Sequence, residues 1–351
     1  MSSISYANPP GLIVGSVFLE VLAGGSVALR FLTRKWKEQP VIASDWLALV
    51  GFVFGTGLFI VEVYAIAAHL LGYTIGGTLE EEATVSERLN HAKYVEFSFL
   101  LFGTLGVGFV KLSTCFLYLH LFGKLRFRPF LIFWTIIITL WTLTFFIFLF
   151  AECGLHYEAL YQATAEYDKY CKSAIPSGWI QAGTDVGTDL VTLLIPIPVV
   201  LGLRMSKGLK VLTLLIFAIG GLTVVASTVK AYIYINATLD RYTEDALITL
   251  TAVSIWNLAE VQIGIIATSG PVIRYGIAKL LPSSASLRSW MDSLRWHSKQ
   301  SSSPSSNFPQ MTSSEEGLRR AGSKGQSEDG EDSRTDKAYP YQMNVIRQPP
   351  I

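Results

Sequence analysis

The sequence predicts an all-α membrane protein, a bundle of seven transmembrane helices with its N-terminus outside, its C-terminus inside and a disordered cytoplasmic tail. Half of the 351 residues are hydrophobic and only 16% are charged, a composition outside the range of soluble domains. Seven apolar spans are each long enough to cross roughly 30 Å of hydrocarbon. Basic and acidic loops alternate between these spans. No basic surface suited to nucleic acid is predicted.

Each apolar span is expected to form one helix. The spans cover residues 11–32, 45–69, 94–121, 129–151, 178–203, 211–235 and 246–271. The first is of full membrane length and is followed by Arg34, Lys35 and Lys37, so we interpret it as a retained helix and not as a cleaved signal peptide. The predicted organisation is a short outer N-terminus (1–10), a membrane domain (11–281) and a disordered Ser-rich tail (282–351).

The charges of the loops predict the orientation. Basic residues gather in alternate loops and at the start of the tail: Arg34, Lys35, Lys37, Lys124, Arg126, Arg128, Arg204, Lys207, Lys210, Arg274, Lys279 and Arg288. The other loops are acidic or mixed: Glu80, Glu81, Glu82, Glu87, Glu152, Glu158, Glu166, Asp168, Asp240, Glu244 and Asp245. The positive-inside rule then places the basic loops in the cytoplasm without a conflicting loop.

Covalent features of the outer loops agree with this orientation. Cys153 and Cys171 share the fourth loop, where the compartment is oxidising, and we expect a disulfide there, with two free thiols as the alternative. Cys115 lies within the third span and is expected to be inert packing. Asn236 begins a glycosylation sequon on the outer side, although it adjoins a helix end. The three cysteines have no metal-ligand spacing.

The fifth span is unusual because it carries two acidic residues, Asp185 and Asp189, four positions apart on one helix face. Burying two carboxylates in hydrocarbon is costly, so such residues suggest a functional site. The structural alternative is that they pair with other intramembrane charges and fix helix packing. In this alternative Lys230, at similar depth, is a possible partner of Asp185, and Lys111 could extend towards the inner surface. One lysine does not neutralise two carboxylates, so one of the pair is expected to hold a proton.

Other charged residues within the spans are expected to turn inward and line a polar cavity that opens outward. Asp185 and Asp189 would supply a general acid, and Glu260 on the last helix a base or stabilising carboxylate. The predicted ligand pocket adds four residues: Glu62, Glu96, Lys230 and Trp256. Aromatic residues near membrane boundaries also serve as interfacial anchors. Such chemistry, for example the opening of an epoxide, needs no metal and no cofactor.

Several short motifs indicate a family. They are Lys111-Leu112-Ser113, Tyr118-Leu119-His120-Leu121-Phe122, Thr188-Asp189-Leu190, Pro196-Ile197-Pro198, Ser227 with Lys230, and Trp256 with Glu260, Gly264-Ile265-Ile266 and Pro271. In these motifs the chain resembles the fungal rhodopsin-like domain of ascomycete integral membrane proteins, over roughly residues 11–281. The resemblance implies a seven-helix bundle in proteins that are either receptor-like surface sensors or members of secondary-metabolite clusters, including the satratoxin-cluster type. Residues 247–271 contain no lysine for a retinal Schiff base, so light sensing by that route is not expected.

Two functions remain open at this point. In the first, the protein serves a secondary-metabolite pathway and handles a lipophilic polyketide or terpenoid intermediate, either as a cofactor-independent hydrolase or cyclase or by binding alone. In the second, it is a receptor-like sensor whose basic inner loops and tail contact a G protein. Its expected surroundings are the lipid bilayer of an endomembrane or the plasma membrane, a lipophilic small molecule, and other pathway enzymes or a G protein. Nucleic acid is excluded.

Overall fold

The computed structural model describes residues 6, 8–73, 82–122, 128–154, 156, 159, 160, 167, 169–198, 207–239 and 246–280. Side chains are described throughout these ranges except at 82–89, 122, 207–213, 246 and 274–280. Many of the loop charges that predicted the orientation, and the whole predicted tail, therefore lie outside the described residues.

Seven long helices make up the described part of the membrane domain, and no strand occurs there. The all-α prediction is thus confirmed. The helices are α1 (Pro9–Trp36), α2 (Ala43–Ala67), α3 (Glu82–Phe122), α4 (Arg128–Ala151), α6 (Ala174–Leu194), α8 (Lys207–Leu239) and α9 (Ala246–Leu280).

Six of these helices, α1, α2, α3, α4, α8 and α9, are long and apolar enough to cross a membrane. The exception is α6, whose 21 residues span about 31 Å at 1.5 Å per residue but include Asp185 and Asp189. Large apolar side chains such as Phe133 and Ile147 are about 60% exposed on the outside of the bundle, as expected for surfaces that contact lipid. The chain is therefore a multi-pass membrane protein.

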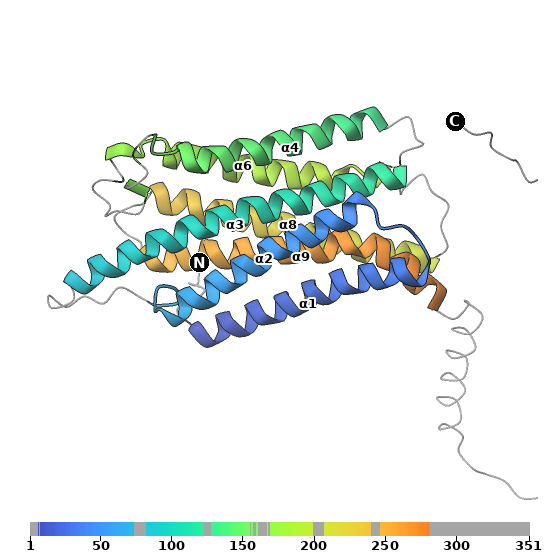
Figure 1. Cartoon of the computed structure of the whole chain (residues 1–351), viewed down its shortest axis with the longest axis horizontal. Coiled ribbons are helices and arrows are strands. Elements are labelled where there is room, and N and C mark those ends of the chain that lie inside the picture. Colours follow the sequence, from blue (N-terminus) through green and yellow to red (C-terminus); the bar gives the residue numbers. More distant parts are fainter. Residues whose placement is uncertain are drawn as a thin grey trace, which may run out of the picture. The chain divides into compact units, whose positions relative to one another are not determined.

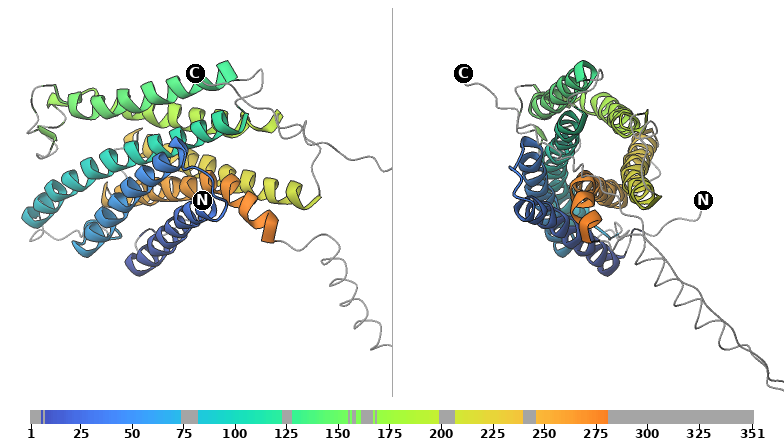
Figure 2. Two further views of the ribbon diagram at one scale, coloured as in Figure 1. Left: turned by 45° about the vertical axis from the view of Figure 1, so that its right-hand side comes forward. Right: turned by 90° about the vertical axis from the view of Figure 1, so that its right-hand side faces the viewer.

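Helices α3 and α9 form the centre of the bundle. α3 packs against α2, α4 and α9, while α9 also packs against α1, α2 and α8. Viewed along the helices, α4, α6 and α8 lie on one side of this central pair, and α1 and α2 lie on the other (Figures 1 and 2). The buried apolar core lies mainly among α1, α2, α3 and α9. The side formed by α4, α6 and α8 is left for polar groups.

A glycine allows the two central helices to approach closely. A Cβ atom on Gly264 of α9 would lie 2.8 Å from Cγ1 of Val110 on α3, too close for any residue but glycine without a shift of the valine. Small residues at such contacts are typical of membrane helices, where close backbone approach replaces the hydrophobic effect. Lys111 adjoins Val110, and Glu260 lies about one helical turn before Gly264, so the glycine helps to bring the two side chains into one region.

A second fixed point joins α1, α2 and α9. The fully buried Arg30 donates to Oδ1 of Asp45 at 2.7 Å and to the backbone oxygen of Thr268 at 2.9 Å. Asp45 also accepts from the Ile42 backbone N–H at 3.0 Å, which caps the start of α2, and its Oδ2 lies 3.0 Å from Arg34 Nε. Every charge in this group has a partner, so it stabilises one arrangement of the three helices.

The fourth loop is tied to the bundle by a disulfide between Cys153 and Cys171, the pair that the sequence suggested. Both cysteines are buried against Ala159, Leu160 and Ala174. The bond links the end of α4 to the start of α6, so it limits how far these two helices can separate at this end of the bundle.

Candidate intramembrane site: a cavity above a buried ion cluster

Five charged residues from four helices meet within the bundle. They are Lys111 of α3, Asp185 and Asp189 of α6, Lys230 of α8 and Glu260 of α9, and we refer to them as the ion cluster. The carboxylates and Lys111 are buried, and the Lys230 side chain is 14% exposed. Residues this far apart in sequence meet because α3 and α9 are the central pair and α6 and α8 pack on each other beside it.

Lys111 binds the two aspartates from one side. Its Nζ lies 2.6 Å from Oδ1 of Asp185 and 2.9 Å from Oδ1 of Asp189, and it donates to Oγ1 of Thr188 at 2.8 Å. It also lies 5.0 Å from the centre of the Trp141 ring, within cation–π range. The expectation that Lys111 extends to the inner surface is therefore wrong. Two carboxylates within reach of a buried ammonium group offer it closer partners than the distant headgroup region does.

Lys230 binds the opposite side of Asp185. Its Nζ lies 2.8 Å from Oδ2 of Asp185 and 2.5 Å from Oε2 of Glu260. The predicted pair of Lys230 and Asp185 is thus present. Asp185 bridges two lysines, with one carboxylate oxygen on each, and this leaves it no oxygen without a cationic partner.

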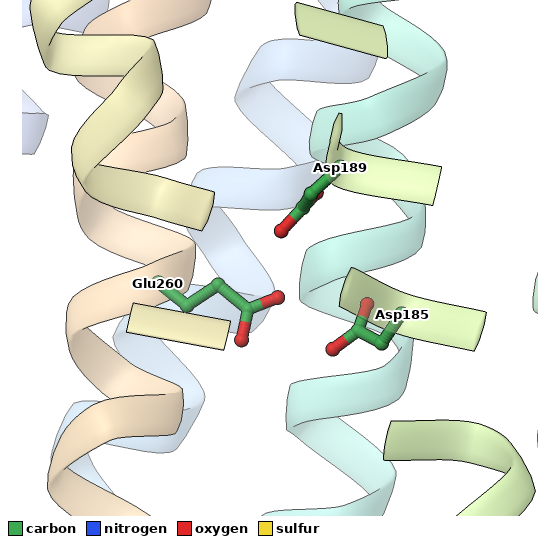
Figure 3. A group of neighbouring side chains, drawn as sticks. All are labelled: Asp185, Asp189 and Glu260. Atoms are coloured by element: carbon green, nitrogen blue, oxygen red, sulfur yellow. The ribbon is translucent and has the colours of Figure 1, made fainter. Parts of the chain in front are cut away.

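The ion cluster contains three carboxylates and two ammonium groups, which is a formal charge of −1. Four of its six carboxylate oxygens accept from lysine. Within the described part of the chain, the other two, Oδ2 of Asp189 and Oε1 of Glu260, are buried and have no hydrogen-bond partner. Figure 3 shows Asp185, Asp189 and Glu260 directed towards one another, with one oxygen from each within 4.8 Å of the others.

A cavity of about 560 Å³ adjoins the ion cluster and is lined by residues of α3, α4, α6, α8 and α9. This volume is typical of sites for drug-sized ligands. Its wall carries aromatic rings such as Phe99, Trp141 and Phe145 and a few polar groups such as Gln181 and Asn257. Asp185 and Lys230 are the members of the ion cluster that line it, so the cavity ends on an ion pair.

A second charged group lies at the end of the cavity near the disulfide. Lys93 forms an ion pair with Glu96 at 2.9 Å, and its Nζ lies 4.1 Å from the centre of the Tyr167 ring. Glu152, in the turn after α4, also lines the cavity. Burial, together with the negative charge of Glu96, raises the pKa of Glu152 to about 7.

The structure brings together most, but not all, of the residues that the sequence suggested. Glu96, Lys230 and Asp185 line the cavity, and Asp189 and Glu260 lie in the ion cluster beneath it. Sequence reasoning counted Lys111 among the charges that turn inward but gave it no role in the site, and it did not propose Glu152. The signal for Glu152 was its position beside Cys153, because a disulfide holds the adjoining turn over the bundle.

Two predicted pocket residues, Glu62 and Trp256, are not among those that line this cavity, and their part in ligand binding stays a prediction. Glu62 is fully buried on α2 and accepts from the hydroxyl of Ser16 on α1 at 2.8 Å. Trp256 donates from Nε1 to the hydroxyl of Tyr6 at 3.2 Å. Glu62 thus faces α1, whereas Trp256, four residues before Glu260, lies on the same side of α9 as that member of the ion cluster.

The sequon residue Asn236 is exposed in the last turns of α8. The Thr238 hydroxyl of this sequon donates to the backbone oxygen of Tyr234 at 2.8 Å and accepts from Nε1 of Trp179 at 2.7 Å. The Thr238 hydroxyl thus forms one hydrogen bond within α8 and one with α6. Glycosylation of Asn236 stays a prediction.

The fold and the site define a multi-pass seven-helix membrane protein with a ligand-sized cavity above a buried ion cluster. The family model described as the fungal rhodopsin domain matches residues 29–279. The match covers most of the chain and all of the ion cluster, and the protein belongs to this family. Comparisons with curated proteins and with solved structures found no match.

The balance of charge in the ion cluster leads to a prediction. Lys111→Met changes the formal charge of the cluster from −1 to −2, and we expect it to lower the stability by about 3–5 kcal/mol, or the apparent Tm by about 10 °C. The double variant Lys111→Met/Asp189→Asn restores −1 and should recover most of this loss. Thermal unfolding in lipid nanodiscs measures both. Lys35→Met, at an exposed position of α1, is the control, and a double variant no better than the single would contradict the pairing.

The raised pKa of Glu152 predicts a pH dependence. The folded protein holds this proton more tightly than the unfolded chain, whose ordinary pKa is 4.5, so the stabilisation is full below that pH and is lost as pH rises through about 7. Between pH 4.5 and pH 7 or so, we expect the apparent Tm of Glu152→Gln to change by a few degrees less than the apparent Tm of wild type. The exposed Glu38→Gln is the control. Parallel pH profiles for Glu152→Gln and wild type would refute the assignment.

Proposed function

We propose that this fungal rhodopsin-like membrane protein binds a lipophilic small molecule with a polar end, in the role of a secondary-metabolite pathway component that handles a polyketide or terpenoid intermediate. The observation that carries the proposal is the cavity of about 560 Å³ that ends on the Asp185–Lys230 ion pair. Aromatic walls suit the apolar body of such a molecule, and the ion pair suits its hydroxyl, carbonyl or carboxyl group.

The chemistry available to a bound molecule depends on which groups face it. Each carboxylate oxygen of Asp185 is paired with a lysine. Asp185 is therefore a counter-ion for the two lysines and is poorly placed to donate a proton. Lys230 faces the cavity and also contacts Glu260 at 2.5 Å. Epoxide opening or cyclisation would therefore use Lys230 as the proton donor to the substrate oxygen, with Glu260 behind Lys230 and Asp189 behind Lys111.

A receptor-like role has one observation in its favour. The ion cluster joins α3, α6, α8 and α9, so a ligand that took over one bond of Asp185 or Lys230 would change the forces among four helices. Such a shift is the kind of change by which a ligand selects one conformation of a bundle. The inner loops and the tail would then contact a G protein.

Both roles assume that the cavity opens on the outer side of the membrane. In the proposed orientation Cys153 and Cys171 face the exterior or lumen, and the basic loops face the cytoplasm. We expect a membrane-impermeant maleimide to label these two cysteines in sealed, right-side-out vesicles only after reduction. The buried Cys115 should stay unlabelled, and a Cys153→Ser/Cys171→Ser variant is the control. Labelling only after the vesicles are opened would reverse the orientation.

Ligand binding is tested by filling the cavity. Val253 lines it on α9, and Val253→Phe adds a ring there, whereas Leu222→Phe on α8 changes a side chain that is 53% exposed. Purified full-length proteins would be incubated with a nonpolar extract of the producing cells, and the retained molecules identified by mass spectrometry. We expect at least one molecule to be retained by wild type and Leu222→Phe and reduced about tenfold or more with Val253→Phe. Equal retention by all three would refute this site.

The two roles are separated by two further measurements. A pathway component predicts that a strain lacking the gene accumulates an intermediate, which microsomes containing the wild-type protein then convert. Unchanged conversion by Asp185→Asn and Asp189→Asn would refute the use of these carboxylates. Truncation after Leu281 should spare conversion but abolish a response that depends on the tail.

A further inference from the structure

We propose that the ion cluster binds one monovalent cation, of the size of sodium, between Asp189 and Glu260. Two buried carboxylate oxygens, Oδ2 of Asp189 and Oε1 of Glu260, have no hydrogen-bond partner among the residues that the structure describes. A carboxylate oxygen without a partner in a membrane interior is costly, so each points to a missing positive group. Both residues direct their carboxylates into the same space (Figure 3).

The charge of the cluster favours a monovalent ion. Three carboxylates and two lysines leave a formal charge of −1, which one monovalent cation neutralises. A divalent cation would instead leave a surplus positive charge next to two ammonium groups, each already within 2.9 Å of a carboxylate oxygen. In a region of low dielectric this surplus is unfavourable.

The spacing of the oxygens favours an ion of the size of sodium. One oxygen from each of Asp185, Asp189 and Glu260 lies within 4.8 Å of the other two. Proteins bind calcium at about 2.4 Å, and sodium has a similar size, so an ion of this size can contact oxygens that lie up to about 4.8 Å apart. The larger potassium ion would force them apart.

Neutral ligands and an entry path are also present. The Ser227 hydroxyl of α8 lies within hydrogen-bonding reach of the Asp189 carboxylate. It donates its one proton to the backbone oxygen of Val224 at 3.1 Å, and in this state its oxygen is free to contact an ion. Asp185 and Lys230 line the cavity, so an ion in the cavity reaches the edge of the cluster and passes this ion pair to reach Asp189 and Glu260. The site is distinct from the ligand cavity, since Asp189 and Glu260 do not line it.

The test compares the stability of full-length protein in sodium and in a cation too large for the site. In lipid nanodiscs, the apparent Tm in sodium chloride at about 150 mM should exceed that in N-methyl-D-glucamine chloride of equal ionic strength by about 2–4 °C. Unfolding can be followed with a thiol dye, because Cys115 is buried in the folded protein. Lithium and potassium series complete the comparison, and potassium should have the smaller effect.

Matched variants locate the ion. Asp189→Asn and Glu260→Gln keep the shape of each side chain and should abolish the sodium effect. Glu62→Gln is the control, because Glu62 also has one buried oxygen without a hydrogen-bond partner, Oε2, but lies outside the ion cluster. It should retain the full effect. The same sodium effect in Asp189→Asn as in wild type would overturn the proposal.

Three other outcomes also decide the question. Equal Tm values in the two salts for wild type, at every pH tested, would assign the missing charge to a proton and overturn the proposal. A larger effect from millimolar calcium than from sodium would overturn the monovalent assignment. If neither cluster variant folds, saturable broadening of the sodium-23 resonance by wild type and by Glu62→Gln supports a bound ion, and its absence overturns it. None of these measurements includes an organic ligand, so they are independent of the proposed function.

Discussion

The bridge that Asp185 makes between Lys111 and Lys230 is the interaction on which the arrangement of the bundle depends. A carboxylate in the middle of a transmembrane helix is unstable in lipid and must meet positive charge inside the protein. Its two oxygens lie 2.6 and 2.8 Å from the two lysines. This requirement fixes the rotation of α6 and draws α3 and α8 towards it. Helix α6 is not among the helices that are apolar enough to cross a membrane by composition, and ion pairs hold it in the bundle. The other six helices have apolar surfaces that are favourable in lipid.

The rest of the bundle supplies the rigidity that such a bridge needs. Gly264 allows α9 to approach Val110 of α3 closely, and the network around Arg30 and Asp45 joins α1, α2 and α9. Buried ion pairs are favourable only when their geometry is held in place, because the desolvation they suffer is large. The close packing of the central helices and the ion cluster thus support each other. The same rigidity keeps open a cavity beside the cluster that collapsing helices would otherwise fill.

Part of the site could be predicted from sequence and part could not. The pairing of Asp185 with Lys230 followed from their similar depths, and the importance of Asp189 and Glu260 followed from the cost of burying charge. Lys111 was misjudged because depth was considered without rotation. Lys111 lies at the same membrane depth as Asp185 and Asp189 of α6, and its side chain extends across the bundle to them. Depth also does not say which neighbour a helix face meets, and Glu62 meets Ser16 of α1 and not the cavity.

By itself, the sequence determined the class of the protein and the inventory of its charges. Apolar length is a local property, so the helices and their number follow from the order of residues. Their ends do not always follow, since α3 begins at Glu82 and not at 94, α6 ends at Leu194 and not at 203, and α9 ends at Leu280 and not at 271. Which carboxylate meets which lysine, and which oxygens have no partner, was decided only by the tertiary structure. The physical reason is that the rotation of each helix is set jointly by all its neighbours, and ion pairs form or fail over distances of about 1 Å. The function of the site depends on that same precision.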